Sequence, residues 1–193
     1  HLSPVLPGSG GGVQGGARGG GIIRIKTANT VTVTGTGIIS ADGGNSMAHK
    51  YGGGASGGSI WMTTSTLTGA GEIRAKGGSA TWKGGGGAGG RIAVYPSSDF
   101  SGFQGSIRCD GGAGRCEGSG CAAADGGIGD VYFNQASGVN AAPTTDLVVR
   151  GHWVGLFPPE RGYKTVTVSA SANLTWAPHI SLAADSVEVQ GAL

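Results

Sequence analysis

The sequence predicts an all-β protein, a right-handed parallel β-helix (β-solenoid) with glycine-rich loops. Glycine supplies 43 of the 193 residues, and many of these glycines recur at similar places in successive segments. Short runs between them alternate apolar with polar or small residues, which indicates strands with one buried face. One such unit cannot bury its apolar face alone, but stacked units can. The right-handed sense follows from the usual chirality of parallel crossovers.

A repeated eight-residue pattern is the strongest evidence for stacking. Segments 37–44, 71–78 and 105–112 share glycine at the start, isoleucine at the third position and a glycine pair at the end. The isoleucines are Ile39, Ile73 and Ile107, so consecutive copies are 34 residues apart. We therefore expect these three side chains to form one inward-facing core ladder.

A second strand precedes each of these segments. Its anchor residues are Ile23, Ile60, Ile92 and Val131, which are 37, 32 and 39 residues apart. The variable spacing places the differences in length in the glycine loops. Inward-facing side chains are expected at the alternating apolar positions Ile23 and Ile25, Val31 and Val33, Ile60 and Met62, Ile92 and Val94, and Val131 and Phe133.

Glycine pairs at the corners are expected to supply positive φ angles for sharp turns. The longer glycine runs at 52–58 and 84–90 exceed what a corner needs. Periodicity leaves two alternatives for them, flexible loops or extended polyglycine segments packed against the stack.

Changes in composition divide the chain into four parts. Residues 1–14 are expected to be an N-terminal extension, 15–135 the β-helix repeats, and 136–146 a linker. Residues 147–193 contain further alternating strands, which either continue the solenoid or start a second β module. The sequence begins without Met and ends within an apolar alternation, so we expect it to be part of a longer chain.

The charge pattern argues against several partners. Thirteen basic and eleven acidic side chains give a net charge of +2, and they are scattered singly. Nucleic acid and anionic membranes are therefore poor candidates. No apolar run approaches the roughly 18 residues of a membrane span. No cofactor motif stands out, because isolated Gly-x-Gly-x-x-Gly matches are unavoidable at this glycine content.

The three cysteines, Cys109, Cys116 and Cys121, lie within 13 residues of one another. Their spacing does not fit the paired C-x-x-C arrangement of a zinc site, so a disulfide in an oxidising compartment is expected, and no metal. A Cys116–Cys121 bridge would close the shortest loop. Cys109 takes the place of Ala41 and Ala75, and the alternative is that it stays a buried, reduced side chain.

Asn173 begins an Asn-Leu-Thr sequon and is the candidate for N-linked glycosylation. Together with the clustered cysteines, it favours a secreted protein that is extracellular or on the cell surface.

Two other patterns in the sequence bear on function. Threonine ranks at 30–36, 64–68 and 165–167 would suit an ice-binding solenoid if they shared one face, but residues 97–101 break the pattern. Asp42, Lys76 and Asp110 occupy one column of the repeats, which predicts a surface ion-pair ladder rather than a catalytic group. No catalytic residue is identified.

The repeat pattern, clearest in 89–95 and 105–108, resembles the glycine-rich β-helix repeats of secreted and cell-surface scaffold proteins. The stretch 30–44 is also similar to repeats of filamentous-haemagglutinin-type adhesins. This resemblance implies a non-enzymatic structural module of an extracellular filament, appendage or cell-surface scaffold. Its partners would be further copies or other subunits of the assembly, with glycans as possible ligands. The alternatives are a carbohydrate-active β-helix enzyme or adhesin, and an ice-binding solenoid.

Overall fold

The computed structural model describes residues 3–12, 17–47, 51–99, 102–117 and 123–133, together with five strands beyond residue 145. It shows an all-β protein. Within the described residues there are thirteen strands and no helix, and every pair of hydrogen-bonded strands is parallel. Parallel pairing is what stacked repeats require, because each strand lies beside its copy in the next unit.

The strands form three sheets. The first contains β1 (Ile22–Lys26), β4 (Ser59–Gly69), β6 (Arg91–Asp99) and β8 (Asp130–Phe133) in that order, with β2 (Thr30–Val33) paired to the second half of β4. The second contains β3 (Ile38–Ser40), β5 (Glu72–Arg74), β7 (Ser106–Arg108), β10 (His152–Val154) and β12 (Asn173–Thr175). The third contains β9 (Asp146–Val149), β11 (Tyr163–Val168) and β13 (Ala184–Val189).

The register places equivalent repeat residues side by side. Ile39 is the partner of Ile73, and Ile73 is the partner of Ile107. The same column continues through Trp153 of β10, so part of the C-terminal region extends the second sheet. The third sheet has its own set of strands. The expected linker falls mainly on residues outside the described ranges.

The apolar core lies where the alternating patterns predict inward-facing side chains. Ile60, Met62, Ile73 and Ile107 are fully buried. Their counterparts in the first unit, such as Ile23 and Ile39, pack on the same cluster but are only partly buried. Within the described part of the chain, β1 and β3 have a neighbouring strand on one side only, which explains the difference.

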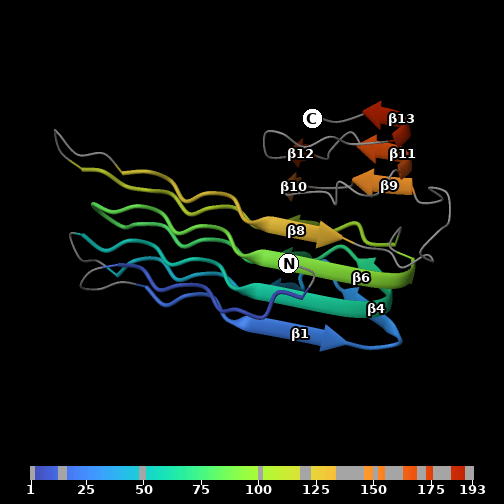
Figure 1. Ribbon diagram of the computed structural model, residues 1–193, viewed down its shortest axis with the longest axis horizontal. Helices are drawn as coiled ribbons and strands as arrows, with labels where there is room; N and C mark the ends of the chain where they lie inside the picture. The colour runs from blue at the N-terminus through green and yellow to red at the C-terminus, as the bar shows by residue number, and fades with distance from the viewer. Residues whose placement is uncertain are drawn as a thin grey trace.

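The glycine-rich runs are extended segments, not flexible loops. Figure 1 shows them running side by side from one end of β1, β4, β6 and β8. We define the first layer as the four segments that lead into these strands, 17–21, 52–58, 84–90 and 123–129. The second layer is the three segments that follow β3, β5 and β7, namely 41–47, 75–80 and 109–115. Neighbours within a layer run parallel, and the two layers run antiparallel to each other.

Each extended segment hydrogen-bonds to its neighbours with a period of three. Segment 52–58 shows this fully, since every third N–H donates to the same neighbour. The donor–acceptor pairs are Gly53–Gly12 and Ser56–Ser9 to the first neighbour, Gly54–Gly85 and Gly57–Ala88 to the second, and Ala55–Gly44 and Gly58–Ala41 to the third. Three residues per turn is the period of a polyproline II helix, which makes no hydrogen bonds of its own and so has its backbone groups available for neighbours.

Close packing of backbones, and not turn geometry, explains most of the glycines. A Cβ atom added to Gly78 or Gly112 would overlap a backbone carbonyl group of the neighbouring segment. Among the described glycines only Gly69 has a positive φ, of 101°. The expectation that corner glycines generally supply positive φ was therefore wrong.

Residues 6–12, expected to belong to an N-terminal extension, pack into the bundle. We call them the outer segment. Gly8 and Gly11 donate to Gly20 and Ala17 of the first layer, at 2.8 and 2.9 Å. The outer segment therefore begins a third layer, on the side of the first layer that faces away from the second.

Candidate functional site

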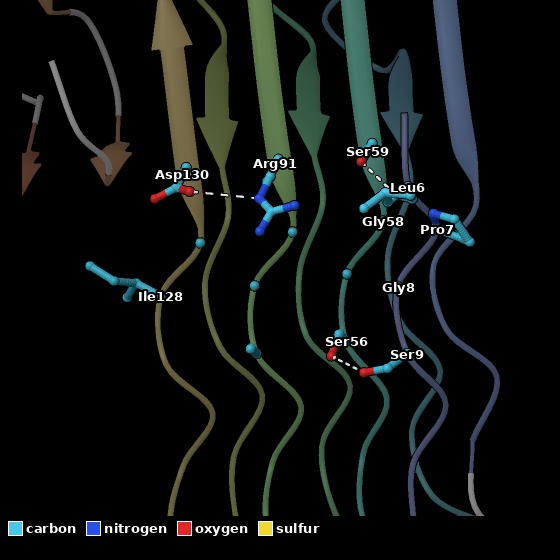
Figure 2. A pocket seen from close by; sticks show the side chains of 15 residues that line it. Leu6, Pro7, Gly8, Ser9, Ser56, Gly58, Ser59, Arg91, Ile128 and Asp130 are labelled. Atoms are coloured by element: carbon cyan, nitrogen blue, oxygen red, sulfur yellow. Dashed lines mark hydrogen bonds and ion pairs between the residues drawn. The ribbon is translucent and has the colours of Figure 1, made fainter. Parts of the chain in front are cut away.

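A groove of about 390 Å³ lies beside the outer segment, on the same face of the first layer. Its floor is backbone from segments 52–58, 84–90 and 123–129. Leu6 to Ser9 form one wall, and Ile128 projects from the opposite side (Figure 2). Because glycine and alanine form most of the floor, its polar groups are mainly backbone N–H and C=O.

Side chains fix the outer segment at the edge of the groove. The Ser59 hydroxyl donates to the Leu6 carbonyl at 2.6 Å, and the hydroxyls of Ser9 and Ser56 are 2.8 Å apart (Figure 2). Ser59 is the partner of Arg91 in the next strand. Arg91 is 3.8 Å from Asp130, and both side chains are more than 40% exposed, so this ion pair is loose.

Sequence analysis did not identify these groove residues. Their signal is weak, because a surface made of backbone leaves little mark in the sequence. The one available clue was the spacing of Gly8 and Gly11, which matches the three-residue period of the bundle.

The column of Asp42 and Lys76 does not form the expected ion-pair ladder. Arg74 pairs with Asp42 at 2.6 Å and with Glu72 at 2.9 Å, while Lys76 pairs with Glu72 at 3.4 Å. Asp42 instead accepts a hydrogen bond from the Lys76 backbone N–H at 2.8 Å. Partial burial lowers the pKa of Arg74, but the carboxylates of Glu72 and Asp42 together raise it by more, so the pKa lies above its usual value.

The next unit repeats part of this arrangement. Arg108 pairs with Asp110 at 2.5 Å. In both units the arginine pairs with an acidic residue two positions away in the sequence, and Arg74 also pairs with Asp42 of the preceding unit. These ion pairs lie where the strands of the second sheet lead into the glycine bundle. The expected ladder was therefore wrong about the basic partner: Asp42 and Asp110 pair with Arg74 and Arg108, and not with Lys76.

Cys109 is buried and is a free cysteine. Burial raises its pKa, and the charges of Asp110 and Asp130 raise it further, so the side chain stays a protonated thiol. It lies 3.6 Å from the Asp130 carbonyl oxygen. Cys116 is exposed and has a partner, whereas Cys121 is outside the described residues, so the Cys116–Cys121 bridge stays a prediction.

Asn173 is the first residue of β12, the edge strand of the second sheet. Its backbone pairs with His152 on one side only. Glycosylation of Asn173 stays a prediction.

The threonine ranks do not continue across the first sheet. Thr32 and Thr68 contact each other through their hydroxyls at 3.0 Å. Thr64, however, is buried and donates to the Asn29 carbonyl, and Thr66 has Asp99 as its partner in β6. Threonines therefore lie opposite one another on β2 and β4 but not across the rest of the first sheet.

Exposed apolar side chains gather near the turns where the bundle segments reverse. Met47 is 72% exposed and Tyr51 63% exposed on either side of the first of these turns, and Trp82 is 38% exposed in the second. The Thr81 hydroxyl donates to the Met47 carbonyl, which ties the two turns together. Trp61 differs from these residues, because Arg24 lies over its ring at 4.1 Å.

The described residues contain neither a metal-ligand cluster nor a membrane-spanning helix. No group of three or more His, Cys, Asp or Glu side chains in the described ranges could hold a metal ion. Those ranges also contain no helix suited to cross a membrane.

Comparison of the chain with protein-family models, with curated proteins and with solved structures finds no match.

Proposed function

We propose that this chain is a non-enzymatic structural repeat module of an extracellular filament, appendage or cell-surface scaffold. In this proposal the first and second sheets are faces of a right-handed parallel β-helix, and units associate along its axis. The resulting rod would be stiff, because neighbouring units share strand pairing and the hydrogen bonds of the glycine bundle.

The observation that carries this proposal is the open edge formed by β1 and β3. Among the described strands, each of these two has a partner on one side only. Ile23, Ile25 and Ile39 are partly buried there, whereas Ile60, Met62 and Ile73, their partners in the next unit, are fully buried. Another unit placed on this edge would complete both the pairing and the core.

Association through the edge is testable with a matched pair of variants on β1. Ile25→Lys puts a charge on the partly buried face at the open edge, and Ile22→Lys puts the same charge on the opposite, 47% exposed face of the same strand. Sedimentation of the full chain over a range of concentrations should show association that Ile25→Lys weakens at least tenfold and Ile22→Lys leaves nearly unchanged.

Electron microscopy of the same material should show rods whose length increases with concentration. Dispersed monomers at all concentrations, with the wild-type chain folded by circular dichroism, would contradict the proposal. Hydrolytic or lyase activity on polysaccharides in such monomers would favour the enzyme alternative, and thermal hysteresis the ice-binding one.

An adhesin is the second candidate, and the exposed side chains at the bundle turns favour it. Met47, Tyr51 and Trp82 supply apolar and aromatic surface, which suits stacking on sugar rings or docking of a protein surface. Screening against glycans tests this candidate. Tyr51→Ala is the variant, and Val5→Ala is an exposed control that lies far from Tyr51 in the sequence.

A further inference from the structure

We propose that the groove beside the outer segment binds an extended glycine-rich segment of another polypeptide chain, through the same backbone hydrogen bonds that hold the protein's own residues 6–12. This inference concerns the flank of the bundle and not the open edge of β1 and β3. It therefore stands apart from the proposed axial association.

The outer segment shows how such a ligand is held. It lies over the junction between segments 17–21 and 52–58. Two of its N–H groups donate to the first segment, and two of its carbonyls accept from the second. The donor–acceptor pairs are Gly8–Gly20, Gly11–Ala17, Ser56–Ser9 and Gly53–Gly12, at 2.8, 2.9, 2.9 and 3.5 Å.

The next junction, between 52–58 and 84–90, offers the same groups in the same order. The Gly20 N–H donates to the Ser56 carbonyl, and in the next pair of segments the Gly57 N–H donates to the Ala88 carbonyl in the same way. The hydrogen-bond pattern therefore repeats when each segment is replaced by the following one in the layer. That shift carries Ser56 and Gly53 onto Ala88 and Gly85, which supply the N–H donors. It carries Gly20 and Ala17 onto Gly57 and Gly54, which supply the carbonyl acceptors.

None of these four groups has a hydrogen-bond partner within the described part of the chain. Among the described residues, the N–H groups of Gly85 and Ala88 have no acceptor, and the carbonyls of Gly54 and Gly57 have no donor. Gly85 and Ala88 are exposed, whereas the covered Gly53 and Ser56 are half-buried. Two donors and two acceptors spaced three residues apart thus lack partners in the described ranges. Gly57 and Ala88 line the groove, and Gly54 and Gly85 lie three residues before them in the same segments.

The geometry also specifies the sequence of the ligand. A Cβ atom on Gly8 or Gly11 would overlap the Ser56 or Gly53 carbonyl, so both donor positions require glycine. Gly12 has open space around its Cβ position, and Ser9 shows that a side chain fits between the glycines. The ligand is therefore a Gly-x-x-Gly segment that runs antiparallel to 84–90.

Arg91 supplies a further contact. It occupies the register position of Ser59, whose hydroxyl binds the Leu6 carbonyl two residues before Gly8. Because its pairing with Asp130 is loose, the Arg91 guanidinium is available to the equivalent carbonyl of the ligand, or to an acidic side chain there. The arrangement is a counterpart of strand addition to a sheet edge, with a period of three instead of two.

The probe is a synthetic peptide with the sequence of residues 4–12, titrated into the full ¹⁵N-labelled chain. The amide signals of Gly85 and Ala88 should shift and gain protection from hydrogen exchange. A peptide with alanine at both positions equivalent to Gly8 and Gly11 should bind at least tenfold more weakly, because its methyl groups would overlap the floor of the groove.

Two variants of Ala88 distinguish the contribution of its backbone N–H to peptide binding from that of its side chain. Ala88→Pro removes the N–H group while keeping a φ that suits an extended segment, and it should weaken peptide binding at least tenfold. Ala88→Ser keeps the N–H group and reproduces the residue found at position 56, so it should bind as well as the wild type or better. Thermal unfolding of each variant checks that the bundle is intact.

Equal binding by Ala88→Pro and the wild type would overturn the proposal, as would signal changes at Ser56 without changes at Ala88, which would show displacement of the outer segment instead. If Ala88→Pro does not fold, the alanine-substituted peptide decides the question with the wild-type chain. Ile25→Lys should leave peptide binding intact, so failure of axial association and failure of this site are distinguishable.

Discussion

Glycine at position 87 should be far more important for stability than glycine at position 85, although both lie in the same extended segment. A Cβ on Gly87 would overlap the Ala55 carbonyl group and lie 3.0 Å from the Ser56 nitrogen. On Gly85 the nearest atom is the Ala124 oxygen at 3.5 Å, which is ordinary van der Waals contact. Gly87→Ala therefore forces backbones apart, whereas Gly85→Ala does not.

The size of the effect follows from the contacts of Gly87. Overpacking a close-packed interior costs about 1–3 kcal/mol. Gly87 also donates to Gly78 and accepts from Gly112, both at 2.8 Å, and separation of the segments weakens these bonds at about 0.5–1.5 kcal/mol each. Together the loss is about 2–6 kcal/mol. For a chain of this size, each kcal/mol lowers the Tm by roughly 2–4 °C.

Gly85→Ala should have the opposite sign. Its new methyl group is exposed and fits, while alanine reduces the conformational entropy of the unfolded chain, which stabilises a protein by about 0.4–1 kcal/mol at permissive positions. Urea unfolding monitored by circular dichroism measures both variants. Equal changes in the free energy of unfolding would refute the view that backbone contact, and not backbone flexibility, is the reason for these glycines.

Three further outcomes are expected. Ile73→Ala should lower the free energy of unfolding by about 2–5 kcal/mol and Ile39→Ala by clearly less in urea titrations, because Ile73 is fully buried between two units while Ile39 is partly buried at the edge. The raised pKa of Cys109 stabilises the fold below the unfolded thiol's pKa of about 8.5, and this stability is lost as the pH rises above it; relative to Cys109→Ala, unfolding measurements should show a loss of up to about 1.4 kcal/mol per pH unit. Material from a eukaryotic secretory pathway should lose glycan mass from Asn173 on glycosidase treatment, and an unmodified residue in such material would contradict the sequon prediction.

Strand positions and register could be predicted because side chains report them. Ile73 and Ile107 alternate with polar neighbours and recur at a fixed spacing, and the structure makes them partners in a parallel sheet. Local alternation identifies a buried face, and the repeat length identifies the neighbour. Both signals are carried by the sequence of each unit.

The packing of the glycine bundle could not be predicted in the same way. Segment 52–58 contains only Gly, Ala and Ser, so no change of residue type marks which N–H faces which neighbour. Two of its three neighbours are set by contacts more than 30 residues apart, such as those of Gly57 with Ala88 and of Ser56 with Ser9. Sequence reasoning therefore reached the two alternatives, flexible or extended, and the hydrogen bonds decided between them.

The ion pairs show a different limit. Asp42 and Lys76 do occupy equivalent positions in neighbouring units. Charged side chains, however, are long enough to pair with residues that are not at the equivalent position. Arg74 pairs with Asp42 of the preceding unit, and Lys76 pairs with Glu72, four residues earlier in its own unit. Column position constrains the backbone, whereas the partner of a long side chain depends on reach and competition.

The bundle has a consequence for how this protein can be recognised. A surface of glycine backbone exposes rows of N–H and C=O groups, much as the edge of a sheet does, and such rows favour pairing with other chains. The outer segment covers one junction of the first layer, through Gly8 and Gly11. At the adjoining junction four equivalent backbone groups have no partner in the part of the chain that the structure describes, and Arg91 lies at one end. Since backbone groups carry no sequence information, selectivity there must come from the exclusion of side chains at every third position of the ligand. A glycine-rich chain is therefore suited to recognise its own kind.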